Sequence, residues 1–277
     1  MMQKRAAIFS TLFALLFATF AFGKITAAVI RKGAHKSARQ SSKDTLAYTY
    51  NGEDSRTDSC KNAGGCSYTA VYYPVFNKDS LLNDTIKQII LNNLNPYMGG
   101  ESRDSKDFEK TIKDVVGVYS SVDSTSEQQQ PMTYELNISV LTQGSSLIVI
   151  DVKQEMSGGA HPNSSEEYFN WDTKTDRVIS IDDLLVNDYD PKFTAIAEKI
   201  FRKDEKLGKN EPLNDYNFEN GEFALNDNFR ITPLGIDFFY NTYEIKSYAG
   251  GTTDLLIPYS QIKSLLRPNT VVSQYIK

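Results

Sequence analysis

A run of alternating apolar residues near the middle of the chain most constrains the fold. Residues 134–140 and 148–152 each carry an apolar side chain at every second position. Gln143-Gly144-Ser145-Ser146 lies between them and has the composition of a turn, so this region predicts an antiparallel hairpin with one buried face. A second, shorter hairpin is predicted over residues 168–180.

Helical patterns occur on both sides of these hairpins. Apolar residues recur at helical spacing over 82–94 and 108–119, and Asp79 or Ser80 is the expected cap of the first of these helices. Asp190-Pro191 offers a cap and a first-position proline for a third helix, whose apolar stripe runs to Phe201. The spacing of Ser180 and Asp183 fits a capping box.

Short apolar segments complete the pattern. Strands are predicted at 68–76, 229–231, 236–240 and 255–257, with a short helix near 260–266. Pro74 favours an edge position for the first of these strands because proline cannot donate to a ladder. Since strands and helices do not alternate strictly, we expect an α+β fold, an antiparallel β-sheet with helices packed mainly on one face.

The N-terminus predicts export. Lys4 and Arg5 form a short basic region, residues 6–22 carry no charge, and Ala21-Phe22-Gly23 places small residues where a signal peptidase cuts. Residues 1–23 are therefore predicted to be a signal peptide. The alternative is an uncleaved anchor, because the uncharged run is just long enough to cross a bilayer if tilted. The rest of the chain is expected to be periplasmic or extracellular in either case, with no other attachment to a membrane.

The remaining chain divides into three predicted parts. Residues 24–66 are polar and without periodicity, which is typical of a flexible spacer. The spacer contains Cys60 and Cys66, which we expect to form a structural disulfide because the chain is exported. A redox pair is the alternative, although five residues separate the cysteines rather than two. An N-terminal α+β subdomain is expected at 67–125 and a C-terminal α+β subdomain at 126–277.

Composition excludes several classes of function. The formal net charge is −5 and the pI is near 5.2, so no broad basic face is available to neutralise the phosphates of a nucleic acid. Two His and two Cys cannot build a His/Cys-rich metal site with four protein ligands. No dinucleotide fingerprint or P-loop occurs. We therefore expect no metal and no cofactor.

Two unusual runs supply the candidate binding residues. In the first, Gly158-Gly159-Ala160-His161, the glycines permit close backbone approach and His161 could act as a base or ligand. The second run supplies Tyr243 and Tyr248 with the pair Gly250-Gly251, which could line a ligand groove. The alternative for both is structural: turns whose side chains bond to backbone.

Acidic residues give two further candidates. Asp182 and Asp183 could be paired carboxylates for glycoside chemistry, but adjacent aspartates at a helix start are more simply caps. A dispersed acidic stretch follows, which is either a solvated loop or a surface that steers a cationic partner. Its acidic residues are Glu211, Asp215, Glu219, Glu222 and Asp227.

These motifs carry a resemblance to a known family. The GGAH turn, Tyr168-Phe169-Asn170-Trp171-Asp172, and the segment from Ile179 to Leu185 resemble the domain of unknown function 3298. Tyr243 to Gly250 and Ile257-Pro258-Tyr259 are similar to the closing motifs of the same domain. Residues 73–94 are similar to its usual partner, the domain of unknown function 4163. Trp171 stands where that family often has Phe or Tyr.

The resemblance implies an extracytoplasmic, non-catalytic α+β module. The same pair of domains forms the outer, lysozyme-sensing part of RsiV-type anti-sigma factors and accompanies the catalytic domain of PdaC-type peptidoglycan deacetylases. Only five residues precede the apolar segment, and no deacetylase domain is evident, so only binding is expected to carry over. The expected ligand is a lysozyme-like muramidase or peptidoglycan. The alternatives are an envelope hydrolase that uses His161 with Asp182 or Asp183, and a structural envelope protein.

Overall fold

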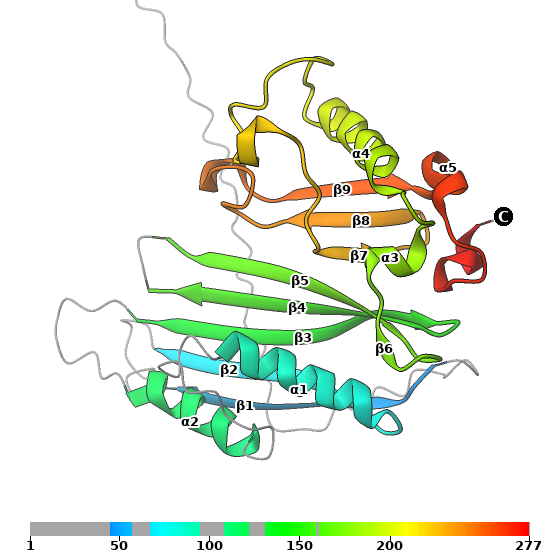
Figure 1. Ribbon diagram of the computed structural model, residues 1–277. Helices are drawn as coiled ribbons and strands as arrows, with labels where there is room; N and C mark the ends of the chain where they lie inside the picture. The colour runs from blue at the N-terminus through cyan, green and yellow to red at the C-terminus, as the bar shows by residue number, and fades with distance from the viewer. Residues whose placement is uncertain (1–44, 57–66, 95–107, 122–130, 159–160, 277) are drawn as a thin grey trace, which may run out of the picture. The chain divides into compact units, whose positions relative to one another are not determined.

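The computed structural model describes residues 45–56, 67–94, 108–121, 131–158 and 161–276 (Figure 1). The predicted signal peptide, Cys60, Cys66 and Gly159 lie outside these residues, so the predictions made for them are not addressed by the structure. Among the described residues, no helix combines the length and apolar character needed to span a bilayer.

A six-stranded sheet forms the first layer, and its spatial order follows the chain (Figure 1). Neighbouring strands are antiparallel except for β2 and β3, which are parallel because two helices make the crossover between them. The predicted 134–152 hairpin is confirmed as β3 and β4, with a bulge between Val140 and Thr142. The strands are β1 (Tyr48–Arg56), β2 (Tyr68–Phe76), β3 (Thr133–Gly144), β4 (Leu147–Ser157), β5 (Asn163–Asp172) and β6 (Arg177–Val178).

The crossover helices α1 (Ser80–Leu94) and α2 (Phe108–Ser121) pack on this sheet through the predicted apolar stripes. Asp79 caps α1, as predicted, because its Oδ1 accepts the backbone N–H of Leu82 at 2.8 Å. Its Oδ2 accepts the indole N–H of Trp171 at 3.2 Å, so one buried carboxylate ties the start of α1 to β5.

A second sheet contains β7 (Phe229–Ile231), β8 (Gly235–Tyr240) and β9 (Thr253–Pro258), all antiparallel. The helix α4 (Asp190–Asp204) and the single turn α5 (Tyr259–Ile262) pack against β9. The predicted α+β class is thereby confirmed. The remaining short helices are α3 (Ile181–Leu184), η4 (Glu219–Gly221), η5 (Tyr248–Gly250), η6 (Lys263–Leu265) and η7 (Val271–Tyr275).

Two predicted helix starts have different outcomes. The capping box of α3 is confirmed, since the Ser180 side chain and the Asp183 side chain cap each other's backbone. The helix α4 begins one residue earlier than expected, so Asp190 is its first residue and Tyr189 holds the cap position. The expected role of Asp190 as cap is therefore wrong, although its carboxylate still accepts the hydroxyl of Thr194 at 3.0 Å.

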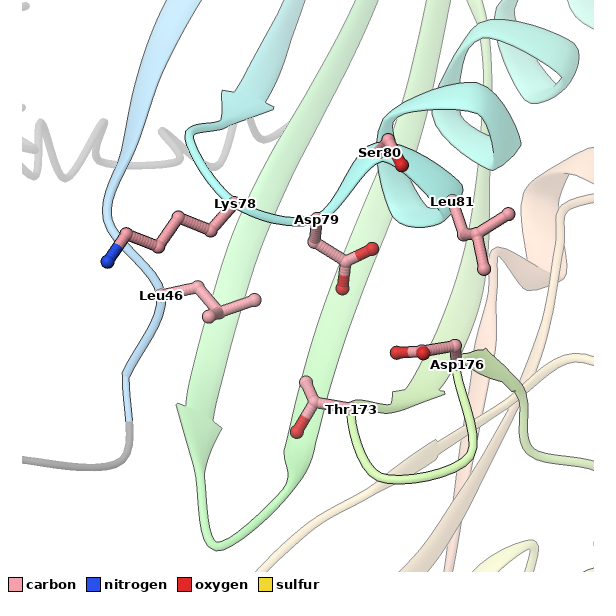
Figure 2. A pocket seen from close by; sticks show the side chains of 7 residues that line it. All are labelled: Leu46, Lys78, Asp79, Ser80, Leu81, Thr173 and Asp176. Carbon is pink, nitrogen blue, oxygen red and sulfur yellow. The ribbon is translucent and has the colours of Figure 1, made fainter.

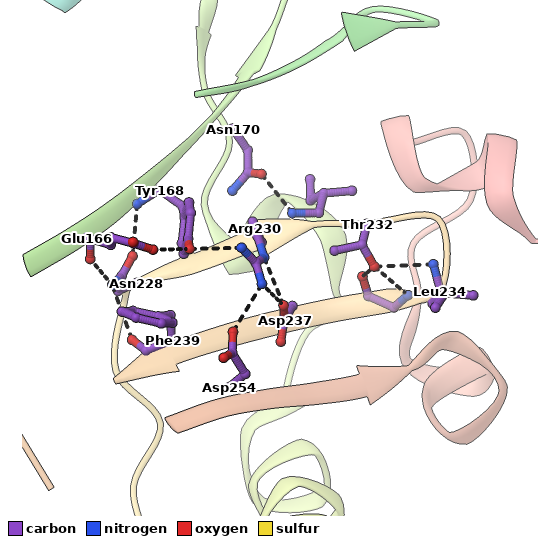
Figure 3. Close-up of polar contacts among 12 residues, drawn as sticks. Glu166, Tyr168, Asn170, Asn228, Arg230, Thr232, Leu234, Asp237, Phe239 and Asp254 are labelled. Atoms are coloured by element: carbon purple, nitrogen blue, oxygen red, sulfur yellow. Dashed lines mark hydrogen bonds and ion pairs between the residues drawn. The ribbon is translucent and has the colours of Figure 1, made fainter. Parts of the chain in front are cut away.

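Asparagine side chains join the two sheets. Asn170 of β5 is 1% exposed, and its amide N–H donates to the carbonyl of Phe229 at 2.8 Å. Its Oδ1 accepts the backbone N–H of Ile231, also at 2.8 Å (Figure 3). One side chain thus supplies β7 with the donor and the acceptor that a neighbouring strand would supply.

Asparagine side chains also bond backbone groups along the part of the β5 edge that precedes Asn170. Oδ1 of Asn228 accepts from the backbone N–H of Tyr168 at 2.9 Å, while its Nδ2 donates to the carbonyl of Glu166 at 2.8 Å. Asn241, just after β8, bonds both backbone groups of Glu166, at 2.7 and 3.0 Å. These contacts fix the loop after β8 beside the start of β5.

The predicted spacer needs correction. The strand β1 lies within residues 24–66 and pairs with β2 along its whole length. Its side chains are mostly exposed and polar, because an edge strand is held by its backbone bonds and buries little apolar surface. Residues 48–56 therefore lack the apolar alternation by which a strand is recognised in a sequence.

The expected edge position of Pro74 is also wrong, because β2 lies between β1 and β3. Successive backbone nitrogens of a strand face opposite sides. The N–H of Asn77 points to β1 and that of Tyr68 points towards β3. Counting from either residue places the nitrogen of Pro74 on the β3 side. The pairing with β3 ends at Tyr72. The N–H that proline lacks would have had no ladder partner there.

The predicted boundary between residues 125 and 126 falls between β2 and β3, which pair in one sheet. The six-stranded sheet therefore contains strands from both predicted subdomains. The second apolar core is instead formed largely by residues from Ile179 onward, with Leu147 and Val149 contributed by β4.

Candidate aromatic binding site

Two loops bring three of the predicted site residues into contact. His161 lies two residues before the start of β5, and Tyr243 and Tyr248 lie between β8 and β9. The imidazole of His161 stacks on the ring of Tyr248, with ring centroids 4.0 Å apart and planes 28° apart. The hydroxyl of Tyr243 lies 3.0 Å from Nε2 of His161. We call His161, Tyr243 and Tyr248 the aromatic cluster.

The rings of the aromatic cluster are open to solvent. Tyr243 is 50% exposed and Tyr248 is 41% exposed, which places both among the most exposed large apolar side chains of the described residues. Their centroids are 5.6 Å apart and their planes differ by 35°. Large aromatic side chains that stay exposed and close together are typical of binding surfaces.

Hydrogen bonds within the cluster occupy its polar hydrogens. Nδ1 of His161 is 3.3 Å from the carbonyl of Pro162, and because a carbonyl can only accept, this nitrogen carries the hydrogen in the neutral ring. Nε2 is then the acceptor for the hydroxyl of Tyr243. The hydroxyl of Tyr248 donates to the same Pro162 carbonyl at 3.2 Å. A ligand therefore meets ring faces rather than free donors.

The backbone at the cluster is unusual. Tyr243 has φ = 70°, a left-handed conformation that is costly for a bulky residue and that concentrates at functional sites. The loop is held by Asn241, whose backbone N–H donates to the Glu244 carboxylate at 2.8 Å and whose side chain bonds β5. These bonds of Asn241 hold the loop, and with it the ring of Tyr243, in place without a ligand.

The predicted glycines shape the loops instead of lining the site. Gly158 has φ = 117°, and a Cβ there would lie 2.7 Å from Cγ of Met132. A Cβ on Gly250 would lie 2.9 Å from Cβ of Lys246, and Gly251 has φ = 68°. The structural interpretation therefore fits these three residues.

The acidic stretch lies directly beside the Tyr243 loop. We call residues 211–227 the acidic loop. The backbone N–H of Asn217 donates to the carbonyl of Ile245 at 3.0 Å, and the amide of Asn226 donates to the Glu244 carboxylate at 2.6 Å. All five acidic side chains of the loop are exposed, and the stretch contains no basic residue. Both segments stand out in the sequence by composition, but nothing in the sequence shows that they are neighbours.

Asp182 and Asp183 are occupied elsewhere. Asp183 accepts two hydrogen bonds from Arg177, at 2.6 and 2.9 Å, in addition to its capping bonds. The hydrogen bonds from the Arg177 guanidinium lower the pKa of Asp183 to about 2. Asp182 accepts the hydroxyl of Tyr189 at 2.8 Å. These contacts match the capping interpretation, and His161 makes none of them.

The sequence did not indicate a second polar cluster, which lies at the sheet junction (Figure 3). Arg230 donates to Asp237 at 2.8 Å, to Asp254 at 3.0 Å and to the hydroxyl of Tyr168 at 2.8 Å. Tyr168 in turn donates to Glu166 at 2.8 Å, and burial raises its pKa above the ordinary range. The available signal was a charged residue in the middle of each short apolar strand, Arg230 in β7 and Asp237 in β8.

Asp151 of β4 lies near this cluster. Its pKa is raised to about 6, mainly by burial and to a smaller extent by the negative charge of Glu166. Lys153 and Arg230 oppose the shift. The folded state therefore binds the proton of the Asp151 carboxyl more tightly than the unfolded chain does. As a result, the free energy of unfolding falls as the pH rises from about 4 to about 6.

We predict that Asp151→Asn raises stability by about 1 kcal/mol near pH 7.5, a value reduced for the partial solvent exposure of the carboxyl. Near pH 3.5 the variant and the natural protein should unfold at the same temperature, because both carry a neutral side chain. Thermal unfolding at the two pH values measures this, and equal stability at pH 7.5 would contradict it.

A cavity of 260 Å³ lies at one end of the six-stranded sheet (Figure 2). Its lining includes Asp79, whose two oxygens are committed to Leu82 and Trp171. Lys78 and Asp176 leave its wall with mixed charge. Across the described ranges, no group of three or more His, Cys, Asp or Glu side chains is placed to hold a metal. The aromatic cluster is therefore the better candidate site.

Fold and site together define an α+β protein with an exposed aromatic cluster. Residues 182–260 match the family described as "Protein of unknown function (DUF3298)", so this chain contains a domain of that family. The match includes Tyr243 and Tyr248 and excludes His161. The resemblance predicted from the sequence is confirmed.

Two curated proteins show more distant similarity. Immunogenic protein MPT64 of Mycobacterium tuberculosis is 28% identical over 187 residues, covering 63% of this chain and 78% of that protein. Peptidoglycan-N-acetylmuramic acid deacetylase PdaC of Bacillus subtilis is 23% identical over 211 residues, covering 74% of this chain and 40% of the enzyme. These relatives are secreted or cell-envelope proteins.

Solved structures of the same family share the fold. A member from Bacteroides fragilis superposes with a TM-score of 0.63 at 19% identity, covering 84% of this chain and 98% of that one. A member from Pseudomonas aeruginosa gives 0.61 at 18% identity, covering 82% and 96%.

Proposed function

We propose that this chain is an exported, non-catalytic binding module of the cell envelope and that it binds peptidoglycan through the aromatic cluster. One observation carries the proposal: His161, Tyr243 and Tyr248 form an exposed group of rings that is held in place by its own hydrogen bonds. Such a surface offers ring faces to the C–H face of a sugar, and little side-chain conformational entropy is lost on binding because the rings are already ordered.

The bonding of His161 supports a non-catalytic role. A general base needs a free lone pair close to the proton that it removes. Nε2 of His161 accepts from Tyr243, and Nδ1 faces the carbonyl of Pro162. The aspartates that the hydrolase alternative requires are engaged with Arg177 and Tyr189. A His161→Ala protein that lost an envelope hydrolase activity would favour the hydrolase instead.

Location supports the same proposal. The basic residues, uncharged run and small residues at the N-terminus fit export. The name of one relative states that it deacetylates peptidoglycan, a polymer of the cell envelope. A module that shares ancestry with that enzyme would meet the same polymer.

A lysozyme-like muramidase is the second candidate ligand, and the acidic loop is the observation that favours it. Five exposed carboxylates without a basic residue among them attract a cationic protein and raise its association rate.

A binding experiment with both ligands tests the proposal. The full chain is incubated with insoluble purified peptidoglycan and, separately, with immobilised hen-type lysozyme, at low and high salt. We expect co-sedimentation with peptidoglycan that persists at high salt, because ring stacking is not screened by ions. Salt-sensitive capture by lysozyme alone would shift the assignment to the second candidate. Binding to neither would reject both.

A further inference from the structure

We propose that the aromatic cluster and the acidic loop together select glycan chains whose amino sugars carry free amines over chains that are fully N-acetylated. This inference rests on the proposed glycan-binding function and names the chemical form of the ligand. Its basis is the contact between two segments, one that offers ring faces and one that offers negative charge.

The ring faces favour a cationic sugar. Tyrosine faces carry a partial negative charge, and a cation held over them is attracted by about 0.5–1 kcal/mol at exposed sites. The hydroxyl hydrogens of Tyr243 and Tyr248 are already donated, to His161 and to Pro162. An acetamido group would therefore find no donor on these rings for its carbonyl, whereas an ammonium gains from the faces.

The acidic loop adds to this preference. Its Asn217 bonds the carbonyl of Ile245, two residues from Tyr243, so the loop lies beside the aromatic cluster. Glu219 and Glu222 follow shortly after Asn217, and both side chains are exposed. Within the described part of the chain, neither carboxylate has a hydrogen bond or ion pair. Both charges are available to an approaching amine.

The size of the aromatic cluster favours a sugar over a basic protein as the ligand. Three rings cover the area of one or two sugar units, whereas a stable protein interface buries about 1,600 Å² in total. The similarity to a deacetylase gives the amine a chemical source, since removal of an acetyl group from an amino sugar leaves an amine. The reaction that supplies this ligand is therefore a glycan de-N-acetylation.

The test compares two oligosaccharides of equal length, one of glucosamine and one of N-acetylglucosamine, titrated calorimetrically into the full chain at low and high salt. We expect the glucosamine oligomer to bind about five-fold more tightly at low salt, with a smaller ratio at high salt. Glu219→Gln with Glu222→Gln should bring the ratio close to one and leave binding of the N-acetylated oligomer unchanged. The matched control is Asp54→Asn with Asp84→Asn, which removes two exposed carboxylates from β1 and α1 and should keep the ratio.

The outcomes separate this inference from the proposed function. Equal or weaker binding of the glucosamine oligomer, by a protein that still sediments with peptidoglycan, overturns the amine preference alone. A preference that survives in the Glu219/Glu222 variant also overturns it. Failure to bind either oligomer or peptidoglycan overturns the glycan function as well. Amine-selective binding by a Tyr248→Ala protein would remove the aromatic cluster from the site.

Discussion

Replacing Asn170 with leucine is expected to lower the free energy of unfolding by about 3 kcal/mol. The leucine side chain has the same branching as asparagine but leaves the carbonyl of Phe229 and the N–H of Ile231 without their partner. Both groups are buried at the sheet junction, where each unpaired group costs about 1–3 kcal/mol. Urea unfolding followed by circular dichroism measures the loss.

Asn137→Leu is the matched control for this change. Asn137 lies in β3 with an exposed side chain, so the same substitution should change stability by less than about 0.5 kcal/mol. If the Asn170 and Asn137 variants unfold at the same urea concentration, the asparagine bonds do not hold the two sheets together.

Tyr248→Ala is expected to weaken binding to peptidoglycan about 30-fold, since truncation of a central aromatic residue in a binding site costs about 2 kcal/mol or more. The change removes the ring that stacks on His161 and takes away one face of the cluster. Tyr248 is 41% exposed and outside the apolar cores, so the fold should remain intact by circular dichroism. Co-sedimentation over a range of peptidoglycan concentrations gives the affinities.

Tyr50→Ala serves as the control for that experiment. Tyr50 is 53% exposed and lies in β1, so this substitution removes a comparably exposed ring that lies away from the aromatic cluster. Its affinity for peptidoglycan should match that of the natural protein. A Tyr248 variant that is folded and binds like the Tyr50 variant would exclude the aromatic cluster as the glycan site.

Much of the fold could be predicted because its elements carry strong local signals. The hairpin of β3 and β4 carries an apolar residue at every second position over 134–140 and 148–152, and α1 has both an apolar stripe and a cap in Asp79. The strand β1 has no such signal, since its place at the sheet edge depends on backbone pairing alone. The second sheet was visible only as short strands, and the asparagine bonds that attach it depend on residues about 60 positions apart.

The candidate site was predictable as residues but not as a site. His161 and the Tyr243–Tyr248 run stood out by composition, yet they are about 80 residues apart and nothing in the sequence places them together. Their contact arises because Asn241 bonds the edge of β5. The polar cluster around Arg230 was missed for the same reason, since its partners come from β5, β8 and β9.

The most direct test of the glycan site is an NMR titration that observes the aromatic side chains. His161 is one of only two histidines in the chain, so its ring signals can be assigned with a single His161→Gln variant. When soluble peptidoglycan fragments are added, we predict shift changes centred on the rings of His161, Tyr243 and Tyr248. Saturable binding that leaves these rings unchanged and shifts signals elsewhere would contradict the assignment of the site.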